Sequence, residues 1–312
     1  MTRPQLDQST SSNGPTYLAL AVLIFIWAAN FSVVKFALRE MSPLAFNGLR
    51  FTLASILLWL IVKLGGRSMT MDRRYWPALI GLGLLGNTVY QILFIYGIDR
   101  TLAGNASLML AATPIFTTLL SIAFRQERIA WMAWTGVVIS VVGIGLVVWG
   151  GTQAVSFGVD TVRGDLTVLA ASVAWSIYTV GSNPLVRRYG ALPVTAVTMW
   201  IGGFALFIVS IPSFLTQDWT AVRPVSWLAL LFSGAFAIAV AYFIWYYSVR
   251  QIGNTRTTVY SNFIPVVALL IAWLMLAETP TWLQLLGAAA VVGGTVLVRI
   301  GRIELSAVAP AE

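Results

Sequence analysis

Long apolar runs follow one another along almost the whole sequence, and they constrain the fold more than any other feature. A helix that crosses a membrane needs about 20 mainly apolar residues, and runs of this length recur here with only short polar segments between them. Only 10% of the residues are charged, whereas a soluble domain carries roughly 25%. The sequence therefore excludes an ordinary soluble protein and predicts a chain that crosses a lipid bilayer many times.

The apolar runs predict transmembrane helices. Each run is continuous and lacks the inside/outside alternation of a membrane-spanning strand, so a β-barrel is not indicated. We expect an all-α, polytopic membrane protein with ten transmembrane helices. These helices are placed at residues 17–38, 43–64, 76–96, 103–124, 131–149, 166–185, 193–214, 225–247, 257–277 and 282–298.

The distribution of basic residues predicts the orientation of the chain. Cytoplasmic loops of membrane proteins are enriched in lysine and arginine. With the N-terminus placed inside, 13 of the 19 basic residues fall in cytoplasmic segments and five in outer segments, while Arg50 lies within the second span. Both termini are therefore expected in the cytoplasm, with the protein in a bacterial inner (plasma) membrane. The net charge of +8 reflects this topology, and we expect no nucleic-acid partner.

The sequence contains neither cysteine nor histidine, and this excludes whole classes of chemistry. Thiolate metal sites, and catalytic dyads that pair serine or cysteine with histidine, cannot be built. The sequence has no metal, phosphate-loop or dinucleotide motif, and its acidic residues are not clustered within the apolar runs. We therefore expect no enzyme activity, no metal and no cofactor.

The second half of the sequence repeats the first. Residues of the two halves match without a gap, at an offset of 151, at Trp76 and Trp227, Gly83 and Gly234, Tyr96 and Tyr247, Pro114 and Pro265, Glu127 and Glu278, Trp131 and Trp282, Gly136 and Gly287, Gly143 and Gly294, and Gly150 and Gly301. Trp27 and Arg39 match Trp175 and Arg187 at an offset of 148. Because each half holds five spans, the second half enters the bilayer from the opposite side. The halves are therefore predicted to be inverted repeats, an architecture that recurs among secondary transporters.

The repeat divides the chain into five parts. Residues 1–15 are polar and are expected to form a flexible N-terminal tail. They are followed by the first five-helix repeat at 16–150, an extracytoplasmic connection at 151–163, the second five-helix repeat at 164–302 and a C-terminal tail at 303–312.

Two stretches resemble the EamA ten-helix branch of the drug/metabolite transporter superfamily. They are GNASLMLAATPIFTTLLSIAFRQERIAWMAWTGVVISVVGIGLVV at 104–148 and TRTTVYSNFIPVVALLIAWLMLAETPTWLQLLGAAAVVGGTVLV at 255–298. In both, small residues precede a proline, an apolar stretch, a glutamate, a tryptophan and a glycine-rich last helix, and IWAANFSVVK in the first span is also similar to the family. The aromatic-rich spans look closest to its aromatic amino acid exporters, which implies alternating-access transport. Tyr178 of WSIY replaces Asn30 of WAAN, so an asymmetric cavity is expected.

Polar and aromatic residues deep in the predicted spans are the candidates for a binding site. Residues three or four apart share a helix face, and the candidates recur at this spacing. The expected substrate-binding residues are Trp27, Asn30, Asn87, Tyr90, Gln91, Phe94, Trp175, Tyr178, Tyr242 and Tyr246. Packing within the bundle is the alternative for each ring, and an interhelical hydrogen bond is the alternative for each amide.

Prolines and glycines within the spans predict bends and close helix contacts. Pro114 and Pro265 each remove a backbone hydrogen bond, so each is a structural kink or acts as a hinge or gate. The glycines of the fifth and tenth spans permit close packing, either within the molecule or at a dimer seam. A monomer and a homodimer therefore both stay open. Glu127 and Glu278 lie at span ends and are expected at the membrane interface.

Charged residues are nearly absent from the middle of the predicted spans, which narrows the function. No acidic residue lies there, and this disfavours a carboxylate-based proton relay and a pump for lipophilic cations. Lys35 is expected to reach the outer interface, and Arg50 to bond helix-end carbonyls or a substrate carboxylate. Aromatic and amide groups suit a neutral or zwitterionic small molecule. We expect a secondary transporter that exports amino acids, aromatic and other neutral ones, without such a relay; another small metabolite such as a nucleotide sugar, or a drug, is the alternative substrate.

Overall fold

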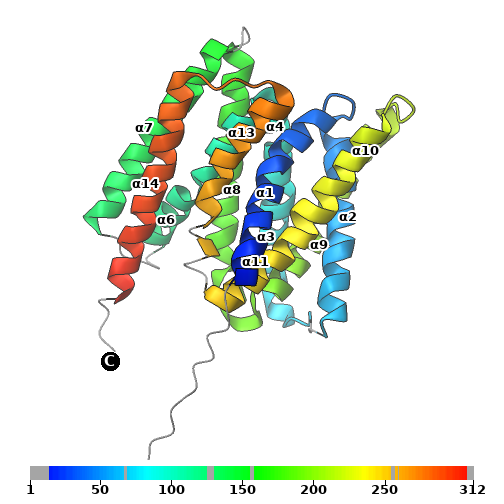
Figure 1. The fold of residues 1–312 in the computed structure, drawn as a ribbon. Helices are drawn as coiled ribbons and strands as arrows, with labels where there is room; N and C mark the ends of the chain where they lie inside the picture. The colour runs from blue at the N-terminus through cyan, green and yellow to red at the C-terminus, as the bar shows by residue number, and fades with distance from the viewer. Residues whose placement is uncertain are drawn as a thin grey trace, which may run out of the picture.

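The computed structural model describes residues 14–66, 69–124, 130–154, 158–253, 257–258 and 260–307, and this part of the chain is helical without a strand (Figure 1). The first half contains α1 (Gly14–Ala37), α2 (Pro43–Leu64), η1 (Arg73–Tyr75), α3 (Trp76–Leu84), η2 (Leu85–Val89), α4 (Tyr90–Arg100), α5 (Ala103–Ala111), α6 (Thr113–Ala123) and α7 (Trp131–Ala154). The second contains α8 (Gly158–Tyr189), α9 (Ala191–Thr216), α10 (Pro224–Leu231), η3 (Phe232–Val240), α11 (Ala241–Ile252), η4 (Ser261–Phe263), α13 (Ile264–Leu276) and α14 (Trp282–Ala307). Glu127 lies outside the described residues.

Eight helical segments of the described chain are long and apolar enough to cross a membrane. They are Gly14–Ala37, Pro43–Leu64, Arg73–Arg100, Ala103–Ala123, Trp131–Gly150, Ala191–Thr216, Pro224–Ile252 and Trp282–Gly301. Each overlaps a predicted span, and the bounds of Pro43–Leu64 agree with the prediction. The two remaining predicted spans fall on α8 and on the shorter apolar segment Ser261–Leu276. The expected all-α, many-span fold is therefore confirmed.

Helices extend into the connection predicted at residues 151–163. α7 continues to Ala154 and α8 begins at Gly158, so most of this stretch is helical. Its polar residues favour a helix start rather than a loop. Asp160 lies in the first turn of α8, where the helix dipole stabilises a carboxylate, and Arg163 forms an ion pair with it at 3.5 Å, one turn further along.

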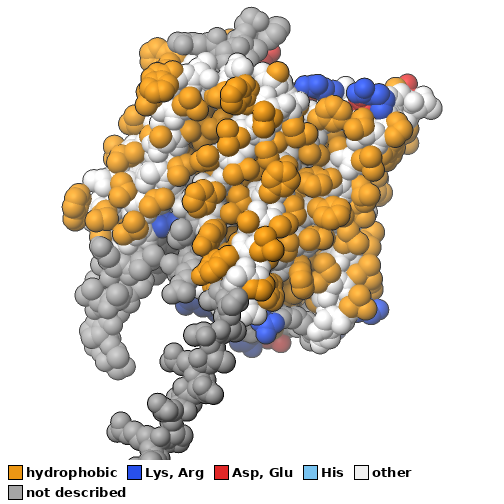
Figure 2. Space-filling view, in the orientation of Figure 1, with side chains coloured by type: hydrophobic (Ala, Val, Ile, Leu, Met, Phe, Trp, Pro, Cys, Tyr) orange, Lys and Arg blue, Asp and Glu red, His pale blue; other side chains and the backbone are white. Residues whose placement is uncertain are grey.

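The outer surface of the bundle is apolar, the reverse of a soluble protein. Figure 2 shows hydrophobic side chains over most of the visible face, with lysine and arginine mainly near its two ends. Trp76, Trp131, Trp227 and Trp282 are all exposed, and each lies at or near the start of a helical segment. Such exposure is required of tryptophans in a belt at the membrane interfaces, and the belt itself stays a prediction.

The glycines of the fifth and tenth predicted spans pack α7 against α14, side by side in Figure 1. A Cβ atom at Gly136 would lie 2.5 Å from the carbonyl oxygen of Gly294, and one at Gly143 would lie 2.8 Å from that of Gly287. No side chain fits at these distances, so the backbones touch only because the residues are glycine. The close contact predicted for these glycines is therefore made within the molecule.

Replacing Gly143 by leucine is expected to lower the unfolding temperature of the detergent-solubilised protein by several degrees. The new side chain would force α7 away from α14, and overpacking of this kind costs about 1–3 kcal/mol or more. Gly145 provides a matched control on the same helix, because a Cβ atom there would meet nothing within 4 Å. Equal unfolding temperatures for Gly143→Leu and Gly145→Leu would show that the glycine contact is unimportant.

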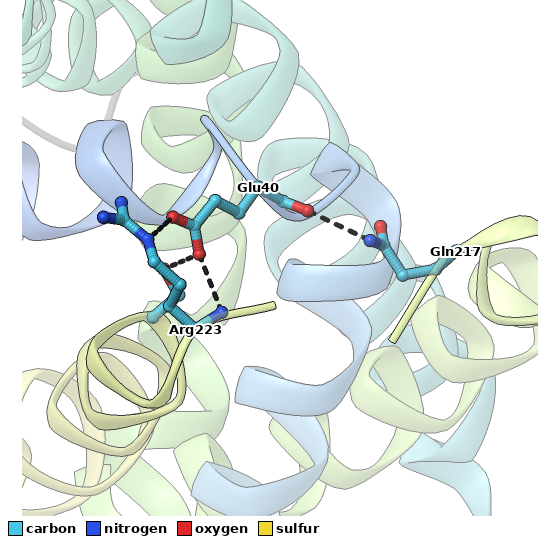
Figure 3. A network of polar contacts seen from close by, with 4 residues as sticks. Glu40, Gln217 and Arg223 are labelled. Carbon is cyan, nitrogen blue, oxygen red and sulfur yellow. Dashed lines mark hydrogen bonds and ion pairs between the residues drawn. The ribbon is translucent and has the colours of Figure 1, made fainter. Parts of the chain in front are cut away.

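A polar network at one end of the bundle joins the connection after α1 to the connection after α9 (Figure 3). The Glu40 carboxylate accepts hydrogen bonds from the Arg223 backbone N–H at 3.0 Å, from the Ser226 hydroxyl at 2.7 Å and from the Arg223 guanidinium. Gln217 donates to the Glu40 carbonyl at 3.0 Å and accepts from the Ser42 backbone N–H at 2.7 Å. We call this the Glu40 end of the molecule, and the opposite end, with the connection between α2 and η1, the Asp72 end.

Candidate substrate-binding site

Two π-helical segments, η2 and η3, interrupt the helical stretches Arg73–Arg100 and Pro224–Ile252. At the repeat offset of 151, residues 85–89 of η2 correspond to residues 236–240, which lie in η3. Both halves therefore have a π-helical segment at the same repeat position. Because π-helical turns are rare and frequently occur at functional sites, this symmetry points to the helices around them. Tyr90 and Gln91 follow η2 directly, and Ser233 lies in η3.

Five of the predicted residues form an aromatic cluster contributed by α4, α8 and α11: Tyr90, Trp175, Tyr178, Tyr242 and Tyr246. The ring centroid of Trp175 lies 5.0 Å from that of Tyr90 and 5.0 Å from that of Tyr178. Tyr242 and Tyr246 stack at 6.3 Å, and Tyr246 and Tyr178 contact threonines three residues apart on α9. All but Tyr178 are partly exposed, so their faces can stack on an apolar or aromatic group of a ligand.

Hydroxyl contacts fix two rings of the aromatic cluster against α9. The Tyr178 hydroxyl lies 3.0 Å from the Thr198 hydroxyl, and the Tyr246 hydroxyl lies 2.6 Å from the Thr195 hydroxyl. These partners satisfy the polar ends of rings whose faces pack against apolar neighbours. The rings are therefore held in place before any ligand binds.

The predicted pair on α1, Trp27 and Asn30, contacts the π-helical segment η3. The Trp27 indole N–H donates to the Ala237 carbonyl at 2.9 Å, and its ring lies 5.5 Å from that of Trp245. The Asn30 Oδ1 accepts from the Ser233 hydroxyl at 2.6 Å. Both residues thus join α1 to η3, and Asn30 remains partly exposed.

Arg50 lies at the centre of a buried polar network that we call the Arg50 network: Asn30, Arg50, Gln91 and Ser233. Its guanidinium donates to the Ser233 hydroxyl at 3.0 Å and to the Gln91 Oε1 at 2.8 Å. Two benzene rings, those of Phe46 and Phe94, lie 5.6 Å from the guanidinium carbon. The sequence predicts bonds from Arg50 to helix-end carbonyls. In the structure these two bonds go instead to side chains of α4 and η3.

The remaining predicted residues lie apart from the open faces of the aromatic cluster. Asn87 is buried against α9, where its Cβ atom occupies the space beside Gly202. Phe94 is buried, and its ring lies 6.1 Å from Tyr90 and 6.1 Å from Phe31. Phe94 therefore supports Tyr90 from the core, and Asn87 faces a helix contact.

The two predicted kinks coincide with breaks between helical elements. α5 ends at Ala111, and Pro114 lies in the first turn of α6. Pro265 lies in the first turn of α13, directly after the 3₁₀ segment η4. Proline is tolerated in the first turn of a helix because its missing N–H has no partner there.

Two charged side chains hold the corner between α4 and α5 at the Glu40 end, and we call this pair the corner clamp: Lys35 and Glu278. The Lys35 ammonium donates to the carbonyls of Ile98 and Asp99 at the C-terminus of α4, at 3.0 and 2.8 Å. The Glu278 carboxylate accepts from the first backbone N–H groups of α5, at Ala103 and Gly104, at 3.1 and 3.3 Å. Each charge thus meets the helix end that stabilises it. Neither role is visible in the sequence, which predicts both side chains at the membrane interface.

The carboxylate of Asp165 is buried at the same end of the molecule, where it joins helices. It accepts from the Thr101 hydroxyl and from the Asn105 amide, the latter at 3.2 Å. Asn105 in turn accepts from the Gln284 amide at 2.7 Å. The predicted span at 166–185 begins one residue after Asp165, so the sequence analysis misses this buried acid. Its partners tie α8 to α5 and α14.

Comparison with known proteins identifies the family of the chain. Residues 14–149 and 162–300 each match the EamA-like transporter family. An uncharacterized transporter of Bacillus subtilis, YdfC, is 30% identical over 274 residues, which are 88% of this chain and 87% of the relative. A probable terminal-alkyne amino-acid exporter of Streptantibioticus cattleyicolor is 27% identical over 281 residues, 90% of this chain and 92% of the relative.

The fold also matches a solved crystal structure. That structure superposes with a TM-score of 0.65 at 20% sequence identity, over 94% of this chain and 99% of the other. The match shows a shared fold over almost the whole length of both chains. Because the family matches at residues 14–149 and 162–300 cover most of the sequence, the chain belongs to the EamA-like transporter family, in the drug/metabolite transporter superfamily of membrane proteins.

Proposed function

We propose that the protein is a secondary transporter that exports amino acids, aromatic and other neutral ones, across the inner membrane of a bacterial cell. The observation that carries this proposal is the aromatic cluster beside the Arg50 network. Partly exposed rings offer stacking faces to an apolar side chain, and amide and hydroxyl groups offer partners to the polar ends of the solute. The relative from Streptantibioticus cattleyicolor, named as a probable amino-acid exporter, supports the same substrate class.

The proposed architecture is ten transmembrane helices in two inverted five-helix repeats, with both termini in the cytoplasm. The eight apolar segments support this count, and we assign α8 and the segment Ser261–Leu276 to the two remaining spans. Two separate matches to one family, at 14–149 and 162–300, support the repeat. Lys63, Arg74 and Arg188 lie toward the Asp72 end, and the segments predicted inside hold 13 of the 19 basic residues, so that end is assigned to the cytoplasm.

Helix packing supports a state that is closed at the Glu40 end. There α5 packs against α13 and α1, and the corner clamp fixes the contact. Toward the Asp72 end α6 packs against α8 and α14, while α11 packs against α1. Alternating access then requires the α4–α5 corner to separate from α1 and α13. Pro114 and Pro265 adjoin the breaks in the two helices involved, and we assign them hinge roles.

Transport is proposed to run down the substrate gradient without a carboxylate-based proton relay. The buried acid Asp165 lies with Thr101 and Asn105 at the Glu40 end, in a network that joins helices. The aromatic cluster is built from rings and hydroxyls, and the Arg50 network adds amides and a guanidinium; none of these groups exchanges protons readily near neutral pH. Asp165 is therefore assigned to closure of the bundle.

Thermal unfolding of the purified protein with a panel of solutes tests the substrate class. A ligand that binds only the folded state raises the unfolding temperature, by an amount set by its concentration relative to Kd. We expect phenylalanine or tryptophan to raise it by several degrees, and an equal concentration of a neutral sugar to leave it unchanged. A rise produced only by a nucleotide sugar or by a lipophilic cationic drug would contradict the proposal.

A further inference from the structure

Arg50 carries a positive charge in the interior of the protein without an acidic partner. Its side chain is 2% exposed, and no carboxylate of the described residues forms an ion pair with it. Its surroundings are neutral: Ser233, Gln91 and the rings of Phe46 and Phe94. Burying an unpaired charge is costly, whereas the structural link between α2, α4 and η3 could be made by a neutral amide. The positive charge of Arg50 would therefore be stabilised by an anionic partner that the described residues do not provide.

The guanidinium retains hydrogen-bonding capacity for such a partner. A guanidinium has five N–H donors, and two hydrogen bonds to side chains are made here. The Nε–H group is buried and has no partner among the described residues. Buried polar groups in folded proteins are normally hydrogen-bonded, so this donor is left for an acceptor that the described residues do not supply.

The Arg50 network adjoins the aromatic cluster at Tyr90. Gln91 follows Tyr90 directly in α4, and the ring of Phe94, which lies 5.6 Å from the guanidinium carbon, stacks on Tyr90 at 6.1 Å. Ser233, the other partner of Arg50, also bonds the partly exposed Asn30. Gln91 lies two residues after the π-helical segment η2, and Ser233 lies in the π-helical segment η3.

We propose that Arg50 is the subsite that binds the carboxylate of the substrate, with Gln91 and Ser233 as positioning residues that hold the guanidinium between transport steps. This inference rests on the proposed function and names the group that the site recognises. A guanidinium can meet a carboxylate through two parallel N–H···O bonds. The aromatic cluster then takes the side chain of the same amino acid. A solute with a ring but no carboxylate would leave the charge of Arg50 unpaired.

The test compares an amino acid with its amide in proteoliposomes. Counterflow of labelled phenylalanine is measured in competition with unlabelled phenylalanine or with phenylalaninamide, which has the same ring but no carboxylate. We expect wild-type protein to prefer the acid at least ten-fold over the amide, and Arg50→Gln to reduce this ratio to about one. Arg100→Gln, at an exposed arginine of α4, is the matched control and should keep the wild-type ratio.

The variants Arg50→Lys and Ser233→Ala, together with transport by wild-type protein, separate failure of the Arg50 inference from failure of the proposed function. Arg50→Lys keeps the charge but loses the paired N–H geometry, so its ratio is expected to fall between those of wild-type protein and Arg50→Gln. If Arg50→Gln does not fold, as judged by its elution and thermal unfolding, Arg50→Lys and Ser233→Ala decide, and a wild-type ratio in both overturns the inference. An unchanged ratio in folded Arg50→Gln also overturns it. Failure of wild-type protein to carry any amino acid would instead refute the proposed function.

Discussion

Replacing Trp175 or Tyr242 by alanine is expected to reduce amino-acid transport at least ten-fold. Each ring offers a face of the aromatic cluster, and Trp175 also supports both Tyr90 and Tyr178 at 5.0 Å. Full burial of an apolar side chain is worth about 1.5–3 kcal/mol, and 1.4 kcal/mol is a ten-fold change in affinity. The loss should appear in the initial rate of labelled amino-acid uptake into proteoliposomes at low substrate concentration, because binding is weakened.

Matched controls separate a lost binding face from general damage. Trp200 and Tyr247 are exposed on α9 and α11 and lie outside the cluster contacts. Trp200→Ala and Tyr247→Ala should therefore retain transport within about two-fold. Wild-type rates in both Trp175→Ala and Tyr242→Ala would remove the aromatic cluster from the binding site, and an equal loss in the two controls would do the same.

Replacing Glu278 by alanine is expected to open the Glu40 end. The backbone N–H groups of Ala103 and Gly104 lose their shared acceptor, and a buried donor without a partner costs about 1–3 kcal/mol. Ala272, on α13, lines the same small cavity as Glu278 and is buried. Because the sequence has no cysteine, Ala272→Cys provides a single reporter thiol. Its labelling by a membrane-impermeant maleimide from the outside should become roughly ten-fold faster in Glu278→Ala.

Two variants control this experiment. Glu278→Gln keeps an acceptor for one N–H group and should label more slowly than Glu278→Ala. Asp218→Asn removes an exposed carboxylate at the same end whose hydrogen bonds go to Thr220 in its own connection, so it should label as wild-type protein does. Labelling of Glu278→Ala at the wild-type rate would show that the corner clamp does not close this end.

The same reporter should show a pH dependence of a defined sign. Burial is the largest influence on the pKa of Glu278 and raises it above its ordinary value in the closed state. An acid with a raised pKa in one state binds protons more tightly there, so acidification favours that state. The labelling rate is first corrected for the thiolate fraction, which is measured with unfolded protein. The corrected rate should fall as the pH is lowered from the raised pKa of Glu278 toward the ordinary glutamate pKa of about 4.3. Glu278→Gln should lack this change, and faster labelling of wild-type protein at low pH would contradict it.

The apolar pattern predicts most of the helices but not the details of their ends. The bounds of α2 follow from the proline at 43 and the charge at 63, and the repeat identifies the corresponding helices of the second half. α8 carries Asp160, Arg163 and Asp165 in its first turns, so hydropathy alone starts it too late. Contacts with other helices decide how far such a polar segment remains helical, and those contacts are not encoded in its own composition.

The sequence predicts which residue types form the site, but not which residues are their hydrogen-bond partners. Helical spacing singles out the aromatic cluster because its rings lie deep in apolar runs. Arg50 stands out in the sequence as the base within a span, but its partner Ser233 is 183 residues away. Glu278 caps a helix that begins 175 residues earlier. Bonds of this range depend on how the two halves pack, which neither periodicity nor local spacing reveals.

Counterflow of labelled phenylalanine is the most direct measurement of amino-acid transport by alternating access. Proteoliposomes are loaded with unlabelled phenylalanine and diluted, without any ion gradient, into labelled phenylalanine. We expect labelled phenylalanine to accumulate transiently and saturably, because an uncoupled carrier exchanges solute through one site that faces each side in turn. An absence of counterflow with folded protein, or counterflow that requires an imposed pH gradient, would contradict this account.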